Sequence, residues 1–149
     1  MELERKNLEI QQQQAKEAFG LRKAELLTSF QNDLRRIEAE LMKSRMETQS
    51  IVFSKFIDFM RDTLKTNDSL IIQQTKLYEL SLQNEAKCEL FLEKAEKLQI
   101  LDTKQLIDIG AAKVKELNLE SSQELQKLEL KIESILGVTQ GNNSLAIMS

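Results

Sequence analysis

Residues 51–64 of the chain, which read IVFSKFIDFMRDTL, contain three of its six phenylalanines. On an α-helix successive residues turn by about 100°, and the apolar side chains of this stretch then share one arc of roughly 160°. The arc consists of Val52, Phe53, Phe56, Ile57, Phe59, Met60 and Leu64. Because this arc is wider than the seam of a two-stranded coiled coil, the stretch predicts a helix that packs against two or more neighbours.

The opposite face of the same helix carries charges of both signs. Lys55 and Arg61 each lie three residues from Asp58, a spacing that favours ion pairs along a solvated helix face. A helix that lies on a membrane surface usually has a polar face rich in lysine and arginine. We therefore interpret residues 51–64 as protein core and keep membrane-surface binding through this helix as an alternative.

The composition of the 149 residues is typical of long helices. Proline is absent, glycine occurs four times, and 30% of the residues are charged. Without proline the chain lacks the residue that most strongly interrupts a helix. A hydrophobic content of 41% in a chain of this length is enough to form a buried core. We therefore predict an all-α protein.

Two interruptions divide the pattern into three predicted helices. Residues 66–69 read TNDS, and these residue types favour turns and helix caps. The first helix is therefore predicted over residues 3–65 and the second over residues 70–100. Thr48 or Ser50 could start a new helix within the polar residues 47–50. Because these residues contain no capping box, we instead expect the first helix to continue through them, with or without a bend.

The strongest local signal for a helix start lies at Asp102. Gln105 follows three residues later, which is the spacing of a capping box. Leu101 and Leu106 flank this pair with the spacing of a hydrophobic staple. We therefore predict that the third helix begins directly after Asp102.

The third helix is predicted to end at Leu136, because the glycine that follows, Gly137, can adopt the left-handed conformation that terminates helices. Ser121 with Glu124 forms a second possible capping box, which could split this helix. Residues 138–149 are rich in glycine and asparagine and are predicted to be a flexible tail.

Helix lengths determine the predicted arrangement. At about 1.5 Å per residue, the first helix would be roughly 95 Å long and the other two about 45–50 Å each, so they can cover only its second half. We predict an antiparallel three-helix bundle over residues 31–137, from which residues 1–30 project as a helical arm. The predicted core consists of Leu34, Ile37, Leu41, Phe53, Phe56, Ile57, Met60, Leu64, Leu77, Phe91, Leu98, Val114, Leu117, Leu125, Leu128 and Ile132.

The arm has one narrow apolar row at steps of three and four residues. Its members are Leu8, Ala15, Phe19, Leu26 and Phe30, with Gln12 and Arg22 at the polar positions between them. Steps of this kind are typical of a coiled-coil seam. We therefore expect the arm to bind another helix, from either a second copy of the chain or a different protein.

The sequence offers few residues for catalysis. It has no histidine, which excludes Ser-His-Asp triads, Cys-His pairs and histidine metal sites. No glycine-rich phosphate loop is present. We interpret Cys88 as a packed thiol and Glu85, Glu89, Glu93 and Glu96 as a solvated helix face. We expect no enzymatic activity, no metal and no cofactor.

Basic and acidic residues alternate along the chain, which has a net charge of −3. The basic residues of the first helix are Arg22, Lys23, Arg35, Arg36, Lys43 and Arg45. Because acidic residues lie between them, binding to nucleic-acid phosphates is not favoured. A small regulator that binds nucleic acid through this helix stays an alternative.

The favoured hypothesis is a non-enzymatic protein–protein interaction module, such as a scaffold, adaptor or inhibitor. It would act through helix packing and form a homo-oligomer through its N-terminal helix. Residues 1–14 lack the apolar stretch of a signal peptide, and no run approaches the roughly 18 apolar residues of a membrane-spanning helix. We therefore expect a cytoplasmic location.

Overall fold

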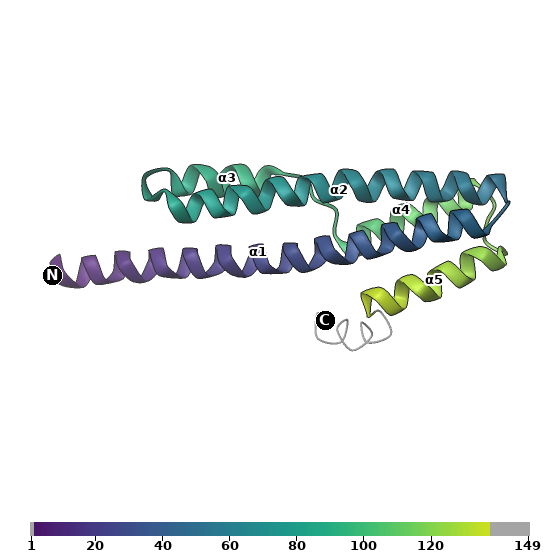
Figure 1. Ribbon diagram of the computed structural model, residues 1–149. Helices are drawn as coiled ribbons and strands as arrows, with labels where there is room; N and C mark the ends of the chain where they lie inside the picture. Colours follow the sequence, from purple (N-terminus) through teal and green to yellow (C-terminus); the bar gives the residue numbers. More distant parts are fainter. Residues whose placement is uncertain (1, 138–149) are drawn as a thin grey trace. The chain divides into compact units, whose positions relative to one another are not determined.

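The computed structural model describes residues 2–137, and for residue 13 and residues 15–21 it describes the backbone alone. The predicted all-α class is confirmed, because the described residues form helices and no strand (Figure 1). The elements are α1 (Glu2–Glu47), α2 (Ile51–Gln83), the short 3-10 helix η1 (Glu85–Lys87), α3 (Cys88–Lys97), α4 (Thr103–Glu116) and α5 (Gln123–Leu136). The predicted tail, residues 138–149, lies outside the described residues.

The predicted continuation of the first helix through residues 47–50 is wrong. α1 ends at Glu47 and α2 begins at Ile51. The hydroxyl of Ser50 accepts a hydrogen bond from the backbone N–H of Phe53 (3.2 Å) and so caps the start of α2. A single serine cap is sufficient here, so the absence of a capping box did not indicate a continuous helix.

The predicted turn at residues 66–69 is also wrong, since these residues lie inside α2. The side chain of Asn67 is only 1% exposed. Its amide donates to the backbone carbonyl of Leu101 (3.1 Å), and its oxygen accepts from the backbone N–H of Leu101 (2.7 Å). Because Asn67 pairs with a distant segment, it does not make the local hydrogen bonds that favour a turn, and the helix continues.

The second helix, predicted over residues 70–100, is interrupted after Gln83. Asn84 has an extended backbone, and its side-chain oxygen accepts from the backbone N–H of Lys87 (3.3 Å) at the start of η1. Asparagine is one of the preferred residues for such a cap. The second half of α2 and α3 consequently form an antiparallel helical hairpin (Figure 1).

The capping box predicted at Asp102 is confirmed. The N–H of Gln105 donates to the carboxylate of Asp102 (2.8 Å), and the N–H of Asp102 donates to the side-chain oxygen of Gln105 (2.9 Å). Gly137 is confirmed as the stop of α5, with a left-handed backbone and a φ of 64°. Both signals depend on residues close in sequence, and for that reason the sequence reveals them.

The predicted third helix is split into α4 and α5 by a second helix stop. Asn118 adopts a left-handed backbone with a φ of 57°. Its N–H donates to the carbonyl of Lys115 (3.2 Å), and the N–H of Leu119 donates to that of Val114 (2.9 Å). This pair of bonds forms a Schellman motif, in which asparagine occupies the position usually taken by glycine.

The cap of α5 is Ser122, one residue after the capping box considered at Ser121. The hydroxyl of Ser122 accepts from the backbone N–H of Leu125 (3.3 Å) and lies 2.9 Å from the carboxylate of Glu124, to which it donates. The backbone N–H of Glu124 and the Ser122 hydroxyl both stabilise the charged carboxylate, and they lower the pKa of Glu124 below its ordinary value. This exposed carboxylate is part of a helix cap.

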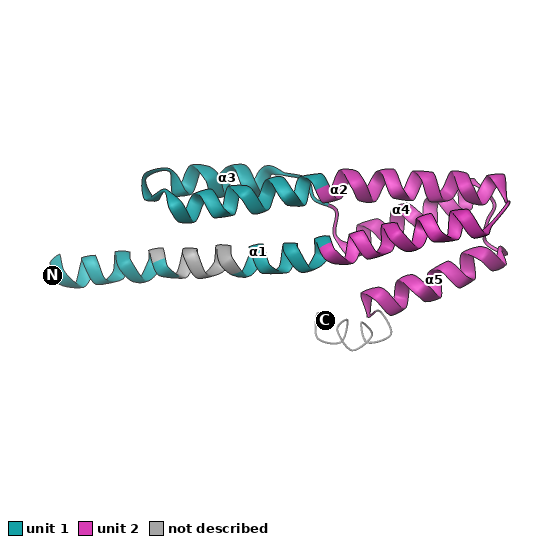
Figure 2. Ribbon diagram, in the orientation of Figure 1, with its two compact units in different colours: residues 1–31, 69–100 teal, residues 32–68, 101–149 magenta. Residues whose placement is uncertain are grey.

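The chain divides into two compact units (Figure 2). Unit 1 contains Met1–Gln31 and Ser69–Ile100, and unit 2 contains Asn32–Asp68 and Leu101–Ser149. α1 and α2 therefore contribute residues to both units. Residues 69–100 thus group with the N-terminal segment, and the division into an arm (residues 1–30), a bundle (31–137) and a tail (138–149) stays a prediction.

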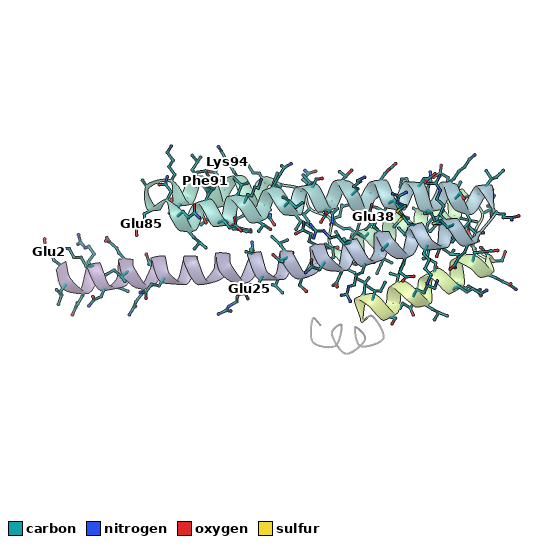
Figure 3. All side chains as sticks on the ribbon, in the orientation of Figure 1. Glu2, Glu25, Glu38, Glu85, Phe91 and Lys94 are labelled. Carbon is teal, nitrogen blue, oxygen red and sulfur yellow. The ribbon has the colours of Figure 1, made fainter. Side chains whose placement is uncertain are left out.

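Four helical segments build unit 2, and each runs antiparallel to the one before it (Figure 2). The segments are residues 32–47 of α1, residues 51–68 of α2, α4 and α5. Ion pairs join the first two segments: Arg45 lies 2.7 Å from Asp58, and Arg61 lies 3.8 Å from Glu38, which points toward α2 (Figure 3). Lys131 joins α5 to α1 through Glu40 (3.7 Å).

The core of unit 2 receives side chains from all four segments. Its buried apolar members are Leu34, Ile37, Leu41, Phe53, Phe56, Ile57, Leu64, Leu106, Leu119, Leu125 and Leu128. The rings of Phe53 and Phe56 stack with centroids 6.1 Å apart. Full burial of one such side chain contributes roughly 1.5–3 kcal/mol, so this set is the main source of stability in unit 2.

Among the described side chains of unit 1, a smaller set is buried. Its members are Ile71, Tyr78, Ser81 and Ala95. The side-chain amide of Gln74 on α2 donates to the backbone carbonyl of Ala95 on α3 (2.6 Å). This hydrogen bond joins the two helices of the hairpin at a position where neither helix has a large apolar side chain.

Candidate functional site

The sixteen core positions predicted from the sequence fall into two sets in the structure. The buried ones are Leu34, Ile37, Leu41, Phe53, Phe56, Ile57, Leu64, Leu125 and Leu128. The half-buried ones are Met60, Leu77, Phe91, Leu98, Val114, Leu117 and Ile132. Leu98 and Leu117 are the C-terminal caps of α3 and α4, and a side chain at a helix end has fewer neighbours than one in the middle.

Two buried residues of α2, Ile71 and Tyr78, were missed as core positions. They belong to a row with alternating steps of four and three residues. The row consists of Phe53, Ile57, Met60, Leu64, Asn67, Ile71, Gln74, Tyr78 and Ser81. It passes through residues 66–69 without a break, and this continuity is the signal that could have identified both residues and the helix that carries them.

Clusters of potential metal ligands do not occur among the described residues. No group of three or more histidine, cysteine, aspartate or glutamate side chains in this part of the chain could hold a metal ion. Cys88, the first residue of α3, is a half-buried free thiol. On the acidic face of α3, Glu93 lies 3.4 Å from Lys97, and both side chains are exposed.

The apolar arc of residues 51–64 faces the interior of unit 2, except for Val52 at its start, which is exposed. Phe53, Phe56 and Ile57 are buried, so a membrane-binding role for this arc would require these side chains to leave the core. None of the helices within residues 2–137 combines the length and apolar character needed to cross a membrane.

Two of the six basic residues considered on α1, Arg36 and Arg45, have carboxylate partners. Arg36 pairs with Asp33 one turn earlier, and Arg45 lies 2.7 Å from Asp58 on α2. Affinity for a nucleic-acid backbone comes chiefly from cations that neutralise phosphates. Cations already paired with carboxylates contribute less to such binding, so this arrangement does not favour a nucleic-acid interface.

The first half of α1 exposes the two leucines of the predicted interface row. Leu8 is 58% exposed and Leu26 is 70% exposed. All described side chains in residues 2–12 are likewise exposed. The side chain of Glu25, next to Leu26, projects from α1 on the side away from α2 and α3 (Figure 3). These leucines are therefore available to a helix that is not part of the described chain.

The other predicted interface positions have different surroundings. Phe30 is half-buried, as is Leu27 on the inward face of the same helix. The side chains of Ala15 and Phe19 lie outside the described residues. The exposed part of the row is thus defined by Leu8 at one end and Leu26 at the other.

A second set of exposed apolar side chains flanks the connection between α1 and α2. Its members are Met42, Met46, Ile51 and Val52. They come from the last turns of α1 and the first turn of α2, and they do not continue as a row along either helix.

Comparison with protein-family models, with curated proteins and with solved structures finds no match for this chain. The function therefore has to be inferred from the surfaces of the molecule. Of the two exposed apolar sets described above, the one on the first half of α1 has the spacing of a known packing mode. Other exposed apolar side chains, including Leu80, Leu90 and Leu130, lie on α2, α3 and α5. The row on the first half of α1 is the candidate functional site.

Proposed function

We propose that the chain is a non-enzymatic protein-interaction module that self-associates by coiled-coil packing of the first half of α1. Residues 1–30 then serve as the coiled-coil arm expected from the sequence. The observation that carries the proposal is the exposure of Leu8 and Leu26 at coiled-coil spacing on one helix. A cytoplasmic location belongs to the same proposal, because the single cysteine allows no intrachain disulfide.

The stability of a helix in water supports the need for a partner. Helices gain most of their stability from packing of an amphipathic face and little from their own hydrogen bonds. The described side chains in residues 2–12 are exposed, so the described chain supplies no such packing there. A helix that covers Leu8 and Leu26 would supply it.

A second copy of the chain fits this row because the segment of the row from Leu8 to Leu26 is nearly symmetric. Leucine stands at both ends of this segment, and a polar residue stands one step inside each end, at Gln12 and Arg22. A row with two polar positions buries less apolar surface than a continuous one. The association is therefore expected to be reversible and dependent on concentration.

Sedimentation equilibrium of the full chain tests the proposal. The unmodified protein should form dimers whose fraction increases with concentration. The variant Leu8→Glu/Leu26→Glu removes four leucines from each dimer and introduces four charges. Since each half-buried leucine contributes roughly 1 kcal/mol, the dimer should weaken by at least about 100-fold.

Ile10→Glu is the matched control for this variant. Ile10 is 54% exposed, close to the value of 58% for Leu8, but it lies two residues away and thus on the opposite side of the helix. The control should leave the dimer unchanged. An unmodified protein that is monomeric at all concentrations would overturn the proposal. Equal weakening of the dimer by Ile10→Glu and by the single variant Leu8→Glu would also overturn it.

A further inference from the structure

We infer that the two copies pair antiparallel along α1, with the two-fold axis at residue 17. This inference rests on the proposed function and names the orientation of the partner. In this register Leu8 of one copy faces Leu26 of the second copy, and Gln12 faces Arg22 of the second copy. Each leucine layer and each polar layer therefore occurs twice, once on either side of the axis.

The polar layer favours this orientation. The guanidinium of Arg22 meets the side-chain amide of Gln12 of the second copy, whose oxygen can accept its hydrogen bond. The same register places Ala15 opposite Phe19 of the second copy, so that a small residue faces a large one. The charged group thus has a polar partner, and the layers have complementary sizes.

Charges beside the row are also complementary. Glu9, which is exposed, comes next to Lys23 of the second copy, and the pair is repeated by symmetry. Lys23 is half-buried, and its Nζ lies 5.8 Å from the centroid of the Tyr78 ring in the same unit. In this register Lys16 lies next to Lys16 of the second copy at the two-fold axis. This is the one pair of like charges beside the row.

A parallel pair in the same register would have less favourable contacts. Arg22 would face Arg22 of the second copy within the row, and Glu4 would lie beside Glu9 of the second copy on both sides. Two guanidinium groups in one layer repel each other and have no acceptor. The exposed residues on α1 therefore select the antiparallel pair on electrostatic grounds.

Disulfide cross-linking distinguishes the two orientations. Cys88→Ser serves as the background, and Leu8→Cys and Leu26→Cys are introduced separately, one of them in a chain with an affinity tag. The two proteins are mixed under reducing conditions, allowed to exchange and then oxidised with oxidised glutathione. Both sites are exposed in the isolated chain, so the variants should fold as the unmodified protein does.

The antiparallel pair predicts a cross-linked heterodimer between the two variants. It should exceed each homodimer by at least about ten-fold, because a disulfide needs Cβ atoms within about 4.5 Å of each other. Leu8→Cys that cross-links efficiently to itself would overturn the orientation and leave the proposed self-association intact. The absence of every cross-link, together with a monomeric background protein, would overturn both.

Discussion

The two halves of α1 belong to one helix, yet their apolar residues have opposite surroundings. In residues 32–47, Leu34 and Leu41 are 2% and 1% exposed, whereas Leu26 in the first half is 70% exposed. The second half is paired with α2 and α5 through ion pairs that include Arg45 with Asp58. The described side chains in residues 2–12 are exposed on every face.

The difference follows from the density of apolar residues along each half. Leu34, Ile37 and Leu41 occupy consecutive steps of four and three and present one continuous apolar face. In the first half, Gln12 and Arg22 interrupt the row. A continuous face stabilises a core within the chain, and an interrupted one suits a weaker contact that forms and dissociates. Stability and the proposed function thus reside in different parts of one helix.

The largest expected effect is a loss of stability in unit 2, which contains the buried half of α1. Phe56→Asp places a charge in the core of unit 2, where Phe56 is buried against Phe53. The loss should be about 3–5 kcal/mol of unfolding free energy. Urea unfolding followed by circular dichroism measures it.

Val52→Asp is the control for this substitution. Val52 is exposed and lies in the first turn of α2, where a negative charge is favourable. It should leave the midpoint of unfolding unchanged or raise it slightly. A Phe56→Asp protein that melts cooperatively at the same temperature would show that the arc is not a core, and the contrast between the two halves would disappear.

The next effect concerns the contact that joins α2 to the start of α4. Asn67→Ala removes both hydrogen bonds to Leu101 and leaves the backbone N–H and carbonyl of Leu101 without these partners. The expected loss is about 2 kcal/mol. Amide hydrogen exchange by NMR should show faster exchange at Leu101, whereas Thr66→Ala, one residue earlier and exposed, should change neither quantity.

Asn67 also shows why part of the fold escaped prediction. Its residue type favours turns because its side chain usually bonds nearby backbone, but here its partner is Leu101, which lies far along the chain. Sequence statistics for residues 66–69 cannot register such a partner. The continuous row from Phe53 to Ser81 could have done so, because a row in phase on both sides of a polar segment indicates one helix.

Helix ends were predictable where the signal was local and conventional. Asp102 and Gly137 act as expected, whereas Ser50 caps α2 without the second half of a capping box. Asn118 adopts the left-handed backbone that favours glycine, and asparagine is the residue most able to replace glycine there. The candidate site depended on exposure, since only the structure shows Leu26 outside and Leu27 half-buried.

A smaller effect is expected in unit 1, where the hydrogen bond between Gln74 and Ala95 joins α2 to α3. Gln74→Ala removes the donor to the carbonyl of Ala95, and the loss should be about 1 kcal/mol. Hydrogen exchange should show faster opening of α3. The exposed neighbour Gln73 provides the control Gln73→Ala, and equal exchange in the two variants would mean that the contact does not stabilise the hairpin.

The smallest expected effect is an increase in the stability of unit 2. Gly110 is a buried residue in the middle of α4, and a Cβ atom there would lie 3.4 Å from Cε of Met60 on α2, an ordinary van der Waals distance. Gly110→Ala should therefore raise the unfolding free energy by about 0.5–1 kcal/mol, because alanine restricts the unfolded chain more than glycine does.

Gly110→Leu tests how large a side chain fits at this position. Its longer side chain would have to displace Met60 from the contact with α4, so it should lower the unfolding free energy by about 1–3 kcal/mol. Both variants are measured by urea unfolding. If Gly110→Ala destabilised unit 2 as much as Gly110→Leu does, the prediction would be wrong. The space between α4 and the side chain of Met60 would then be too small even for a methyl group, which would explain the glycine at this position.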